Sequence, residues 1–427
     1  MSASLASLSL TGAFALALVL GLALRFWLAS RQIRHVARHR DTVPAAFAQT
    51  ITTQAHRKAA DYTVTKARFG LLEMAFGAAV LLGWTLLGGL DWLNQALMQW
   101  IGGGMAQQLA LLAGFVLIGS LLELPFSLYQ TFVIEERFGF NKITPKLWFS
   151  DLVKSVVLGA AIGLPLAALI LWLMGAAGSL WWLWAWGVWM GFNLLAQLIY
   201  PTFIAPLFNK FQPLEDDATR ERVTSLMQRC GFKARGLFVM DGSRRSAHSN
   251  AYFTGFGASK RVVFYDTLLA RLSPGEVDAV LAHELGHFRH NHIRKMLAGL
   301  FAMSLAGFAL LGWLSTQSWF YTGLGVTPNL QDGAPNDALA LLLFLLAVPV
   351  FTVFISPLFA QLSRKHEFEA DAYAISQTSG ADLSSALLKL YEDNASTLTP
   401  DPVFVKFYYS HPPASERLAR MASGVPA

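Results

Sequence analysis

The residues best suited to chemistry lie in the short run HELGH at positions 283–287. His283 and His287 are four residues apart, so on an α-helix they lie about 40° apart and share a face. Two imidazoles placed in this way can bind one zinc ion. Glu284 beside them can act as general base toward a water molecule that the ion makes more acidic. The spacing therefore predicts a zinc hydrolase.

A catalytic zinc site needs a third protein ligand and an open position for water or substrate. The run SRKHEFEADAYA at 363–374 offers Glu367 and Asp371, four residues apart on one face of a predicted helix. We expect Glu367 to complete the metal site and Asp371 to orient a ligand or handle a proton. His366 and Glu369 lie on other faces of that helix and are weaker candidates.

Two more histidines follow the HELGH run, at positions 290 and 292. His290 is seven residues from His283 and is a minor alternative as a ligand, whereas His292 lies off the metal-binding face. A histidine near a metal-binding helix is more often a surface or hydrogen-bonding group, and we interpret both residues in that way. The predicted cofactor is one Zn²⁺ per chain.

The elements around HELGH predict a small α+β unit. Ser273-Pro274-Gly275-Glu276 has the spacing of a capping box with proline at the first helical position, so a helix should begin there. Residues 215–232 have the pattern of an amphipathic helix. Three segments, 236–241, 250–256 and 261–266, have the composition of short strands.

The rest of the chain has the composition of a membrane protein. Hydrophobic residues make up 54% of the sequence, charged residues only 14%, and the mean hydropathy is +0.43. Seven runs are long enough to cross a bilayer. They are Leu8–Leu28, Met74–Leu90, Leu109–Ile134, Val156–Met174, Leu180–Ile199, Met296–Leu314 and Ala338–Ala360. The first run lacks the flanks of a signal peptide, so we expect seven retained spans.

The positive-inside rule orients these spans. Lys and Arg are frequent between the first two spans and after the third, but the segments 91–108 and 315–337 contain neither. This distribution predicts an external N-terminus, with the catalytic site and the C-terminus in the cytosol. The sixth and seventh spans are then antiparallel, so His287 and Glu367 emerge on the same side.

We divide the chain into four regions on this basis. Residues 1–208 form a membrane region with five spans, and 209–295 form a cytosolic catalytic segment with the HELGH helix. Residues 296–361 hold spans six and seven, and 362–427 form a cytosolic segment with the third zinc ligand. The lipid bilayer is therefore one partner of the chain.

Charge and cysteine content exclude other classes of site. The formal net charge is +6 with a pI near 9.4, but the basic residues cluster beside the apolar runs, so we expect no nucleic-acid partner. Cys230 is the single cysteine, which excludes both an intramolecular disulfide and a metal site built from several cysteines.

Four motifs together resemble the CAAX prenyl protease 1 family of integral-membrane zinc endopeptidases, which process C-terminal CAAX tails. They are IEERFGFN at 134–141, HSNAYFTGF at 248–256, HELGH at 283–287, and SRKHEFEAD at 363–371 with YYSHPP at 408–413. The resemblance covers nearly the whole chain, including the number of spans. It implies a fold that is mainly α-helical, with seven transmembrane helices enclosing a chamber and a cytosolic zincin-like catalytic domain.

For the metal site, the resemblance implies the residues that the spacing proposes. These are zinc ligands at His283, His287 and Glu367, catalysis by Glu284, and an acidic auxiliary role, including proton donation, for Asp371.

The resemblance also implies two sites that spacing does not reveal. Asn250, Ala251 and Tyr252 would form an edge strand that pairs with the substrate backbone. His411 would stabilise the oxyanion or the substrate carbonyl, although taken alone it reads as a turn residue before two prolines.

We therefore predict a zinc-dependent membrane endopeptidase whose substrate is a peptide or protein, prenylated or not, cut near a CAAX-type C-terminus. One alternative is a membrane quality-control protease without lipid specificity. Another is a transporter or scaffold with a structural zinc, but a structural site would not need Glu284. Within the third span, Glu123 is expected either to line a chamber or to form a salt bridge with a neighbouring span.

Overall fold

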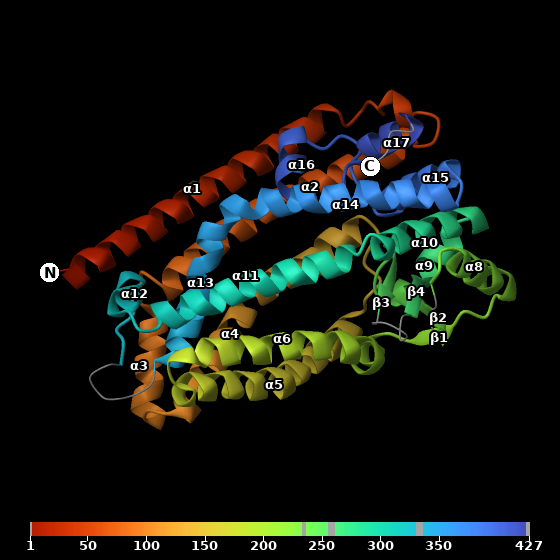
Figure 1. The fold of residues 1–427 in the computed structure, drawn as a ribbon. Coiled ribbons are helices and arrows are strands. Elements are labelled where there is room, and N and C mark those ends of the chain that lie inside the picture. The colour runs from red at the N-terminus through yellow and green to blue at the C-terminus, as the bar shows by residue number, and fades with distance from the viewer. Residues whose placement is uncertain (1, 233–235, 255–260, 330–335, 424–427) are drawn as a thin grey trace.

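The structure is a computed structural model, and it describes residues 2–232, 236–254, 261–329 and 336–423. Long helices run along the length of an elongated molecule, and a small sheet with several shorter helices lies at one end (Figure 1). The N-terminus lies at the opposite end, near α3 and α12 (Figure 1). The helices α3 and α12, whose segments lack Lys and Arg, and the small sheet are thus at opposite ends of the molecule.

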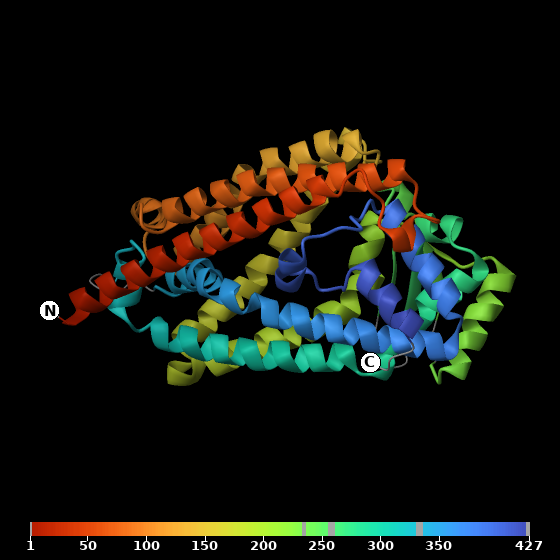
Figure 2. The ribbon, with the colours of Figure 1, turned by 90° about the horizontal axis from the view of Figure 1, so that it is seen from above.

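In the part of the chain that the structure describes, seven helical segments are long and apolar enough to span a membrane, in agreement with the sequence. Their helices are α1 (Ser2–Arg38), α2 (Thr53–Trp84), α4 (Met105–Tyr129), α5 (Pro145–Ala176), α6 (Trp181–Ile199), α11 (His292–Leu314) and α13 (Asp337–Thr352). Seen from above, α1 and α2 run along one side of the molecule, and α11 and α14 run along the other (Figure 2). The fold is mainly α-helical and integral to the membrane, as predicted.

The predicted second span, Met74–Leu90, is wrong in its boundaries. Its helix begins at Thr53 and ends at Trp84, because Thr85 leaves helical geometry and Gly88 takes a left-handed conformation with φ 77°. A separate helix, α3 (Gly89–Ile101), then follows in the segment expected to be a connection. The predicted end of the span was wrong because the apolar run continues through the turn between the two helices.

The seventh span continues into the catalytic end. Helix α13 passes through a 3₁₀ turn at Val353–Ile355 into α14 (Ser356–Gln377). One continuous helical segment therefore crosses the predicted boundary, at residue 362, between the membrane spans and the cytosolic C-terminal segment. Helix α14 thus holds the third candidate ligand in a fixed relation to the membrane region.

Among the described residues the sheet has four strands, in the order β1-β2-β4-β3. They are β1 (Phe211–Pro213), β2 (Gly236–Met240), β3 (Ala251–Thr254) and β4 (Arg261–Tyr265). Strands β2 and β4 are parallel, whereas β3 pairs antiparallel with β4 and is an edge strand of the described sheet. The sequence predicted the last three strands and missed β1, which is short and contains a proline. Gly255 and Phe256 of the predicted second strand lie outside the described residues.

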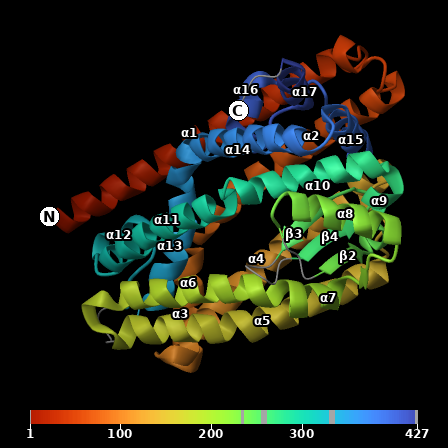
Figure 3. The same ribbon diagram turned by 45° about the vertical axis from the view of Figure 1, so that its right-hand side comes forward.

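Several shorter helices complete the fold. They are α7 (Ala205–Phe208), α8 (Asp217–Arg229), α9 (Asp266–Arg271), α10 (Pro274–Arg289), α15 (Gly380–Asp393), α16 (Pro402–Tyr408) and α17 (Ala414–Ser423), with α12 (Ser318–Gly323) at the other end of the molecule. The predicted capping box is present at the start of α10. Val277, Leu281 and Leu285 of α10 are buried in a core shared with the sheet and α8. Figure 3 shows the sheet beside α8 and below α10.

Two cavities lie between helices of the membrane region, in keeping with the expected chamber. One, of about 590 Å³, is lined by α1, α2, α13 and α16. The other, of about 540 Å³, lies between α2 and α4. Glu123 lines the second cavity together with Glu73, and its role stays a prediction.

Candidate active site

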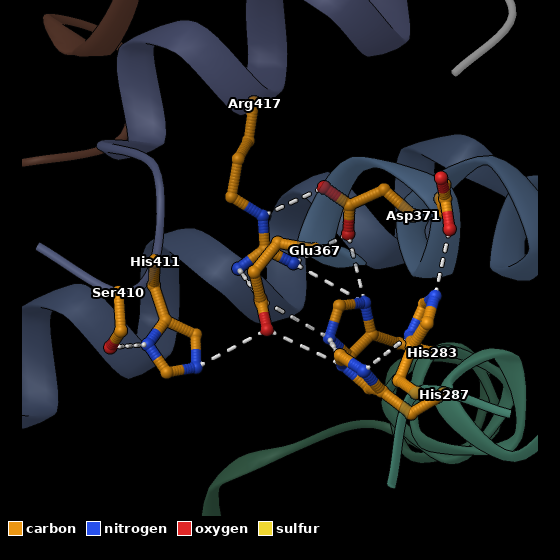
Figure 4. Close-up of polar contacts among 9 residues, drawn as sticks. His283, His287, Glu367, Asp371, Ser410, His411 and Arg417 are labelled. Atoms are coloured by element: carbon orange, nitrogen blue, oxygen red, sulfur yellow. Dashed lines mark hydrogen bonds and ion pairs between the residues drawn. The ribbon is translucent and has the colours of Figure 1, made fainter. Parts of the chain in front are cut away.

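Three predicted ligands converge where α10 meets α14 (Figure 4). The Nε2 atoms of His283 and His287 are 3.3 Å apart. The Oε2 atom of Glu367 lies 3.5 Å from Nε2 of His283, and its Oε1 atom lies 3.3 Å from Nε2 of His287. Three side chains from segments 80 residues apart thus point their ligand atoms at one place.

The spacing of these atoms fits a zinc ion. With zinc–ligand distances of about 2.0–2.1 Å, tetrahedral geometry separates neighbouring ligand atoms by about 3.3–3.4 Å. The two histidine Nε2 atoms, 3.3 Å apart, match this value, and the Glu367 carboxylate comes within 3.3 to 3.5 Å of both of them through its two different oxygens. In addition, Oε2 of Glu367 is buried and has no hydrogen-bond partner among the described residues. A buried carboxylate oxygen of this kind is suited to a cation.

Gly286 allows the two ligand-bearing helices to meet. A Cβ atom at this position would lie 2.9 Å from Cα of Ala370 and 3.0 Å from the Ala370 carbonyl oxygen. Both of these are backbone atoms of α14, so neither can move aside as a flexible side chain would. The glycine of HELGH therefore permits the close crossing that brings Glu367 to the two histidines.

His283 is held by a charged network. Asp371 accepts a hydrogen bond at 2.9 Å from Nδ1 of His283. Arg417 of α17 donates to both oxygens of Asp371, with Nε 2.8 Å from Oδ2. Arg417 also lies 3.8 Å from Oε2 of Glu367. All four side chains are buried, so their charges compensate one another away from water.

Electrostatics favour positive charge at His283. Burial lowers the pKa of this imidazole, but the carboxylate of Asp371, which accepts its hydrogen bond, and the nearby carboxylate of Glu367 outweigh burial and raise the pKa to about 9. Asp371 likewise holds the pKa of Arg417 above its ordinary value despite burial. A divalent metal can supply the positive charge that these carboxylates attract.

His287 has a different neighbour. Its Nδ1 atom lies 3.0 Å from Nδ1 of His292, and Nε2 of His292 lies 2.8 Å from Oε2 of Glu369. The ring of His366 stacks on that of His292, with centroids 4.0 Å apart and an interplanar angle of 12°. His290 also stacks on His292 and is not one of the three convergent ligands.

Two more predicted catalytic residues are Glu284 and His411, and the structure places His411 next to a ligand. Glu284 follows His283 on α10 and is partly exposed. His411 reaches the site from the segment between α16 and α17, with Nε2 3.4 Å from Oε1 of Glu367. Its Nδ1 atom is 2.9 Å from the Ser410 hydroxyl, and the His411 side chain is 66% exposed. An exposed imidazole beside the ligands is accessible to a bound substrate.

The predicted substrate-binding residues lie at the start of edge strand β3. Ala251 and Tyr252 pair with Phe264 and Val263 of β4, and the Asn250 carbonyl accepts a hydrogen bond from the Tyr265 N–H. These contacts use one side of the strand. The edge position agrees with the expectation from the sequence, because an edge strand can pair with an added peptide.

Comparison with known proteins agrees with this geometry. Residues 32–210 match a family model described as CAAX prenyl protease N-terminal, five membrane helices, and residues 213–424 match Peptidase family M48. CAAX prenyl protease 1 of Saccharomyces cerevisiae is 38% identical over 333 residues, which cover 74% of this chain and 72% of the relative. The chain belongs to the CAAX prenyl protease 1 family.

Relatives from other sources cover more of the chain. The CAAX prenyl protease 1 homolog of Homo sapiens is 31% identical over 92% of this chain and 91% of its own length. The crystal structure of Saccharomyces mikatae Ste24p superposes with a TM-score of 0.89 at 31% identity, covering 96% of this chain and 99% of that one. This member of the CAAX prenyl protease 1 family is therefore an integral-membrane metalloendopeptidase, and the transporter or scaffold alternative is wrong.

Reasoning from the sequence missed three residues of the site in this family member. No sequence spacing indicates that Arg417 contacts Asp371, because it lies 46 residues later on a different helix. His292 and Glu369 were noted and set aside, because neither shares the face of the ligands on its own helix. Their contact with each other depends on how α11 and α14 pack, which no local pattern reveals.

Proposed function

We propose that this protein is a zinc-dependent endopeptidase that cleaves near the C-terminus of prenylated CAAX-type proteins. In this proposal His283, His287 and Glu367 hold one zinc ion. The observation that carries it is the convergence of these three side chains, whose ligand atoms lie within 4.8 Å of one another, with Nε2 of His411 3.4 Å from Glu367. Glu284 follows His283 on the same helix. Residues 209–295 and 362–427 together form the catalytic unit.

Zinc, when bound, lowers the pKa of water and polarises the scissile carbonyl. Glu284 accepts a proton from the attacking water and delivers it to the leaving amine. His411, held by Ser410, donates a hydrogen bond to the carbonyl oxygen as negative charge develops on it. Asp371 is ion-paired with Arg417, so it orients His283 and fixes its tautomer; in this proposal it does not donate a proton.

The substrate backbone pairs with the free side of β3. In this arrangement Asn250, Ala251 and Tyr252 present main-chain groups to an extended peptide, which is thereby held along the sheet. Backbone pairing of this kind does not depend on the peptide's side chains. It therefore suits substrates that are cleaved at a similar place near the C-terminus and differ in sequence.

We also propose the orientation given by the positive-inside rule, with the catalytic site and C-terminus cytosolic and the N-terminus external. Basic side chains such as Arg31 and Arg245 lie at the catalytic end, where they pair with Asp401 and Asp151. The segments that lack Lys and Arg include α3 and α12, at the opposite end (Figure 1). Accessibility labelling of single cysteines placed at the two ends, in sealed vesicles, tests this orientation.

The relatives' names motivate the substrate, and one experiment tests it. Purified protein is incubated with a prenylated CAAX peptide and with its unprenylated twin, with a chelator control, and products are identified by mass spectrometry. We expect chelator-sensitive cleavage that prefers the prenylated peptide. Equal cleavage of both peptides would favour the quality-control alternative, and cleavage that persists with chelator would contradict the zinc mechanism.

A further inference from the structure

A chain of hydrogen bonds leads away from the metal-binding face of His287. His287 points Nε2 at Glu367 and at His283, and its Nδ1 atom points the other way, to His292 at 3.0 Å. The second ring nitrogen of His292 reaches Glu369 at 2.8 Å. Nothing in the mechanism proposed above uses His292 or Glu369.

The direction of each hydrogen bond follows from ligation, and this step rests on the proposed function. An imidazole that binds a metal through Nε2 carries its proton on Nδ1. His287 must therefore donate from Nδ1, and Nδ1 of His292 must accept. The proton of His292 is then on Nε2, where it is donated to the carboxylate of Glu369. One arrangement of protons satisfies all three residues.

We propose that His292 and Glu369 are positioning residues, which hold His287 in the tautomer and ring orientation that binds zinc and thereby raise metal affinity. Residues that orient a metal ligand in this way typically change metal affinity by about 10–100-fold when mutated. His292 never touches the metal. Its effect passes through His287 alone.

The local fold holds His292 in place for this role. Helix α10 ends at Arg289 and α11 begins at His292, with Asn291 between them in a left-handed conformation at φ 57°. This sharp change of direction carries His292 back against His287 and leaves it only 4% exposed. The His366 ring stacks on the His292 ring but makes none of the hydrogen bonds in this chain.

Two substitutions at His292 separate hydrogen bonding from packing. His292→Phe keeps a ring of similar size but removes the acceptor for His287. His292→Asn is smaller, but its amide oxygen can occupy the place of Nδ1 and accept the same hydrogen bond. Competition with a zinc chelator, measured on the full-length protein in detergent, gives the zinc affinity of each variant without relying on peptidase activity.

We expect His292→Phe to bind zinc about 10–100-fold more weakly than the unmodified protein, and His292→Asn to recover most of that loss. Glu369→Leu should weaken binding in the same direction. His366→Ala is the matched control, because it removes stacking on the same ring and leaves the hydrogen-bond chain intact. Its affinity should change far less than that of His292→Phe.

Three outcomes would overturn the inference. Unchanged zinc affinity in His292→Phe shows that the hydrogen bond does not matter. Equal losses in His292→Phe, His292→Asn and His366→Ala show that packing alone supports His287. Failure of the unmodified protein to bind zinc refutes the proposed function itself, and the positioning role with it, so the two failures are distinguishable.

Discussion

The two histidine ligands are four residues apart on one helix, yet their surroundings differ in kind. His283 is held by Asp371, which is itself ion-paired with Arg417 near the C-terminus. His287 is held by the imidazole of His292. The nearest carboxylate on this side, Glu369, contacts His292 and not His287 itself. The first arrangement places full charges in a buried site. The second places a neutral ring next to the ligand.

This difference has an energetic consequence. A buried charge network is stable only while every charge has its partner, and removing one partner leaves another uncompensated. A neutral ring can be replaced by another neutral group at lower cost. The His283 side should therefore couple metal binding to folding of the C-terminal segment, and the His287 side should tune metal affinity with little effect on stability.

Arg417→Leu is expected to have the largest effect on stability. It leaves Asp371 and Glu367 without their cation, which should cost about 3–5 kcal/mol. Thermal unfolding in detergent should show a clear fall in melting temperature. Adding Asp371→Leu should recover part of the loss by removing the unpaired carboxylate. A single Arg417 variant as stable as the unmodified protein would show that the charge network is dispensable.

Gly286→Val should damage both sides of the site together. Its side chain meets the backbone of Ala370 on α14, and overpacking of this kind costs about 1–3 kcal/mol. Because α10 and α14 must separate, both histidines move away from Glu367 and zinc content should fall. Gly299→Val in α11 is the control, since nothing lies within 4 Å of its Cβ position. Normal zinc content in Gly286→Val would contradict the close-crossing argument.

Asp371→Asn compared with Glu369→Gln tests the asymmetry between the two ligands directly. Asp371 contacts its ligand, so its loss of charge should lower zinc affinity by about 10–100-fold. Glu369 acts through His292, so Glu369→Gln should have the smaller effect. Chelator competition measures both variants. If Glu369→Gln lowered zinc affinity more than Asp371→Asn, the proposed difference between the charged surroundings of His283 and the neutral surroundings of His287 would be contradicted.

Protonation of Glu276, at the start of the helix that carries both histidine ligands, is expected to have the smallest effect on stability. Glu276 caps the start of α10, and although burial opposes it, hydrogen bonds from Lys389 and Ser385 lower its pKa from 4.5 to about 2. A depressed carboxyl pKa stabilises the fold above about pH 4.5 and loses this contribution as the pH falls toward 2. Between pH 7 and pH 4 the loss is about 1 kcal/mol.

Unfolding measured at both pH values, with Glu276→Gln for comparison, checks this contribution. The unmodified protein should lose more stability between pH 7 and pH 4 than the variant does, because the variant has no carboxylate to protonate. An equal loss in both proteins would assign the acid sensitivity to other groups.

The sequence predicted the parts of this molecule that have a local signature. HELGH, the capping box at Ser273 and the seven apolar runs each follow a fixed spacing or a minimum length. Glu367 could be proposed because membrane topology brought it to the same side as His287. The end of the second span was wrong because hydrophobicity does not mark the turn at Thr85.

The residues that orient the ligands could not be predicted in the same way. Arg417 reaches Asp371 only because α17 packs against α14, and His292 reaches Glu369 only because of the turn at Asn291. Both contacts depend on the angles between helices, which are set by the packing of the whole catalytic end. A ligand has a characteristic spacing, but the residues that support it are defined only by the folded structure.

The central claim is that Glu284 is the general base of a zinc peptidase, and Glu284→Gln tests it most directly. Zinc content and cleavage of the prenylated peptide are measured on the same preparation. We predict one zinc per chain, as in the unmodified protein, and activity lower by about 10²–10⁴-fold. A zinc-loaded Gln variant that cleaves the peptide at the normal rate would contradict the account.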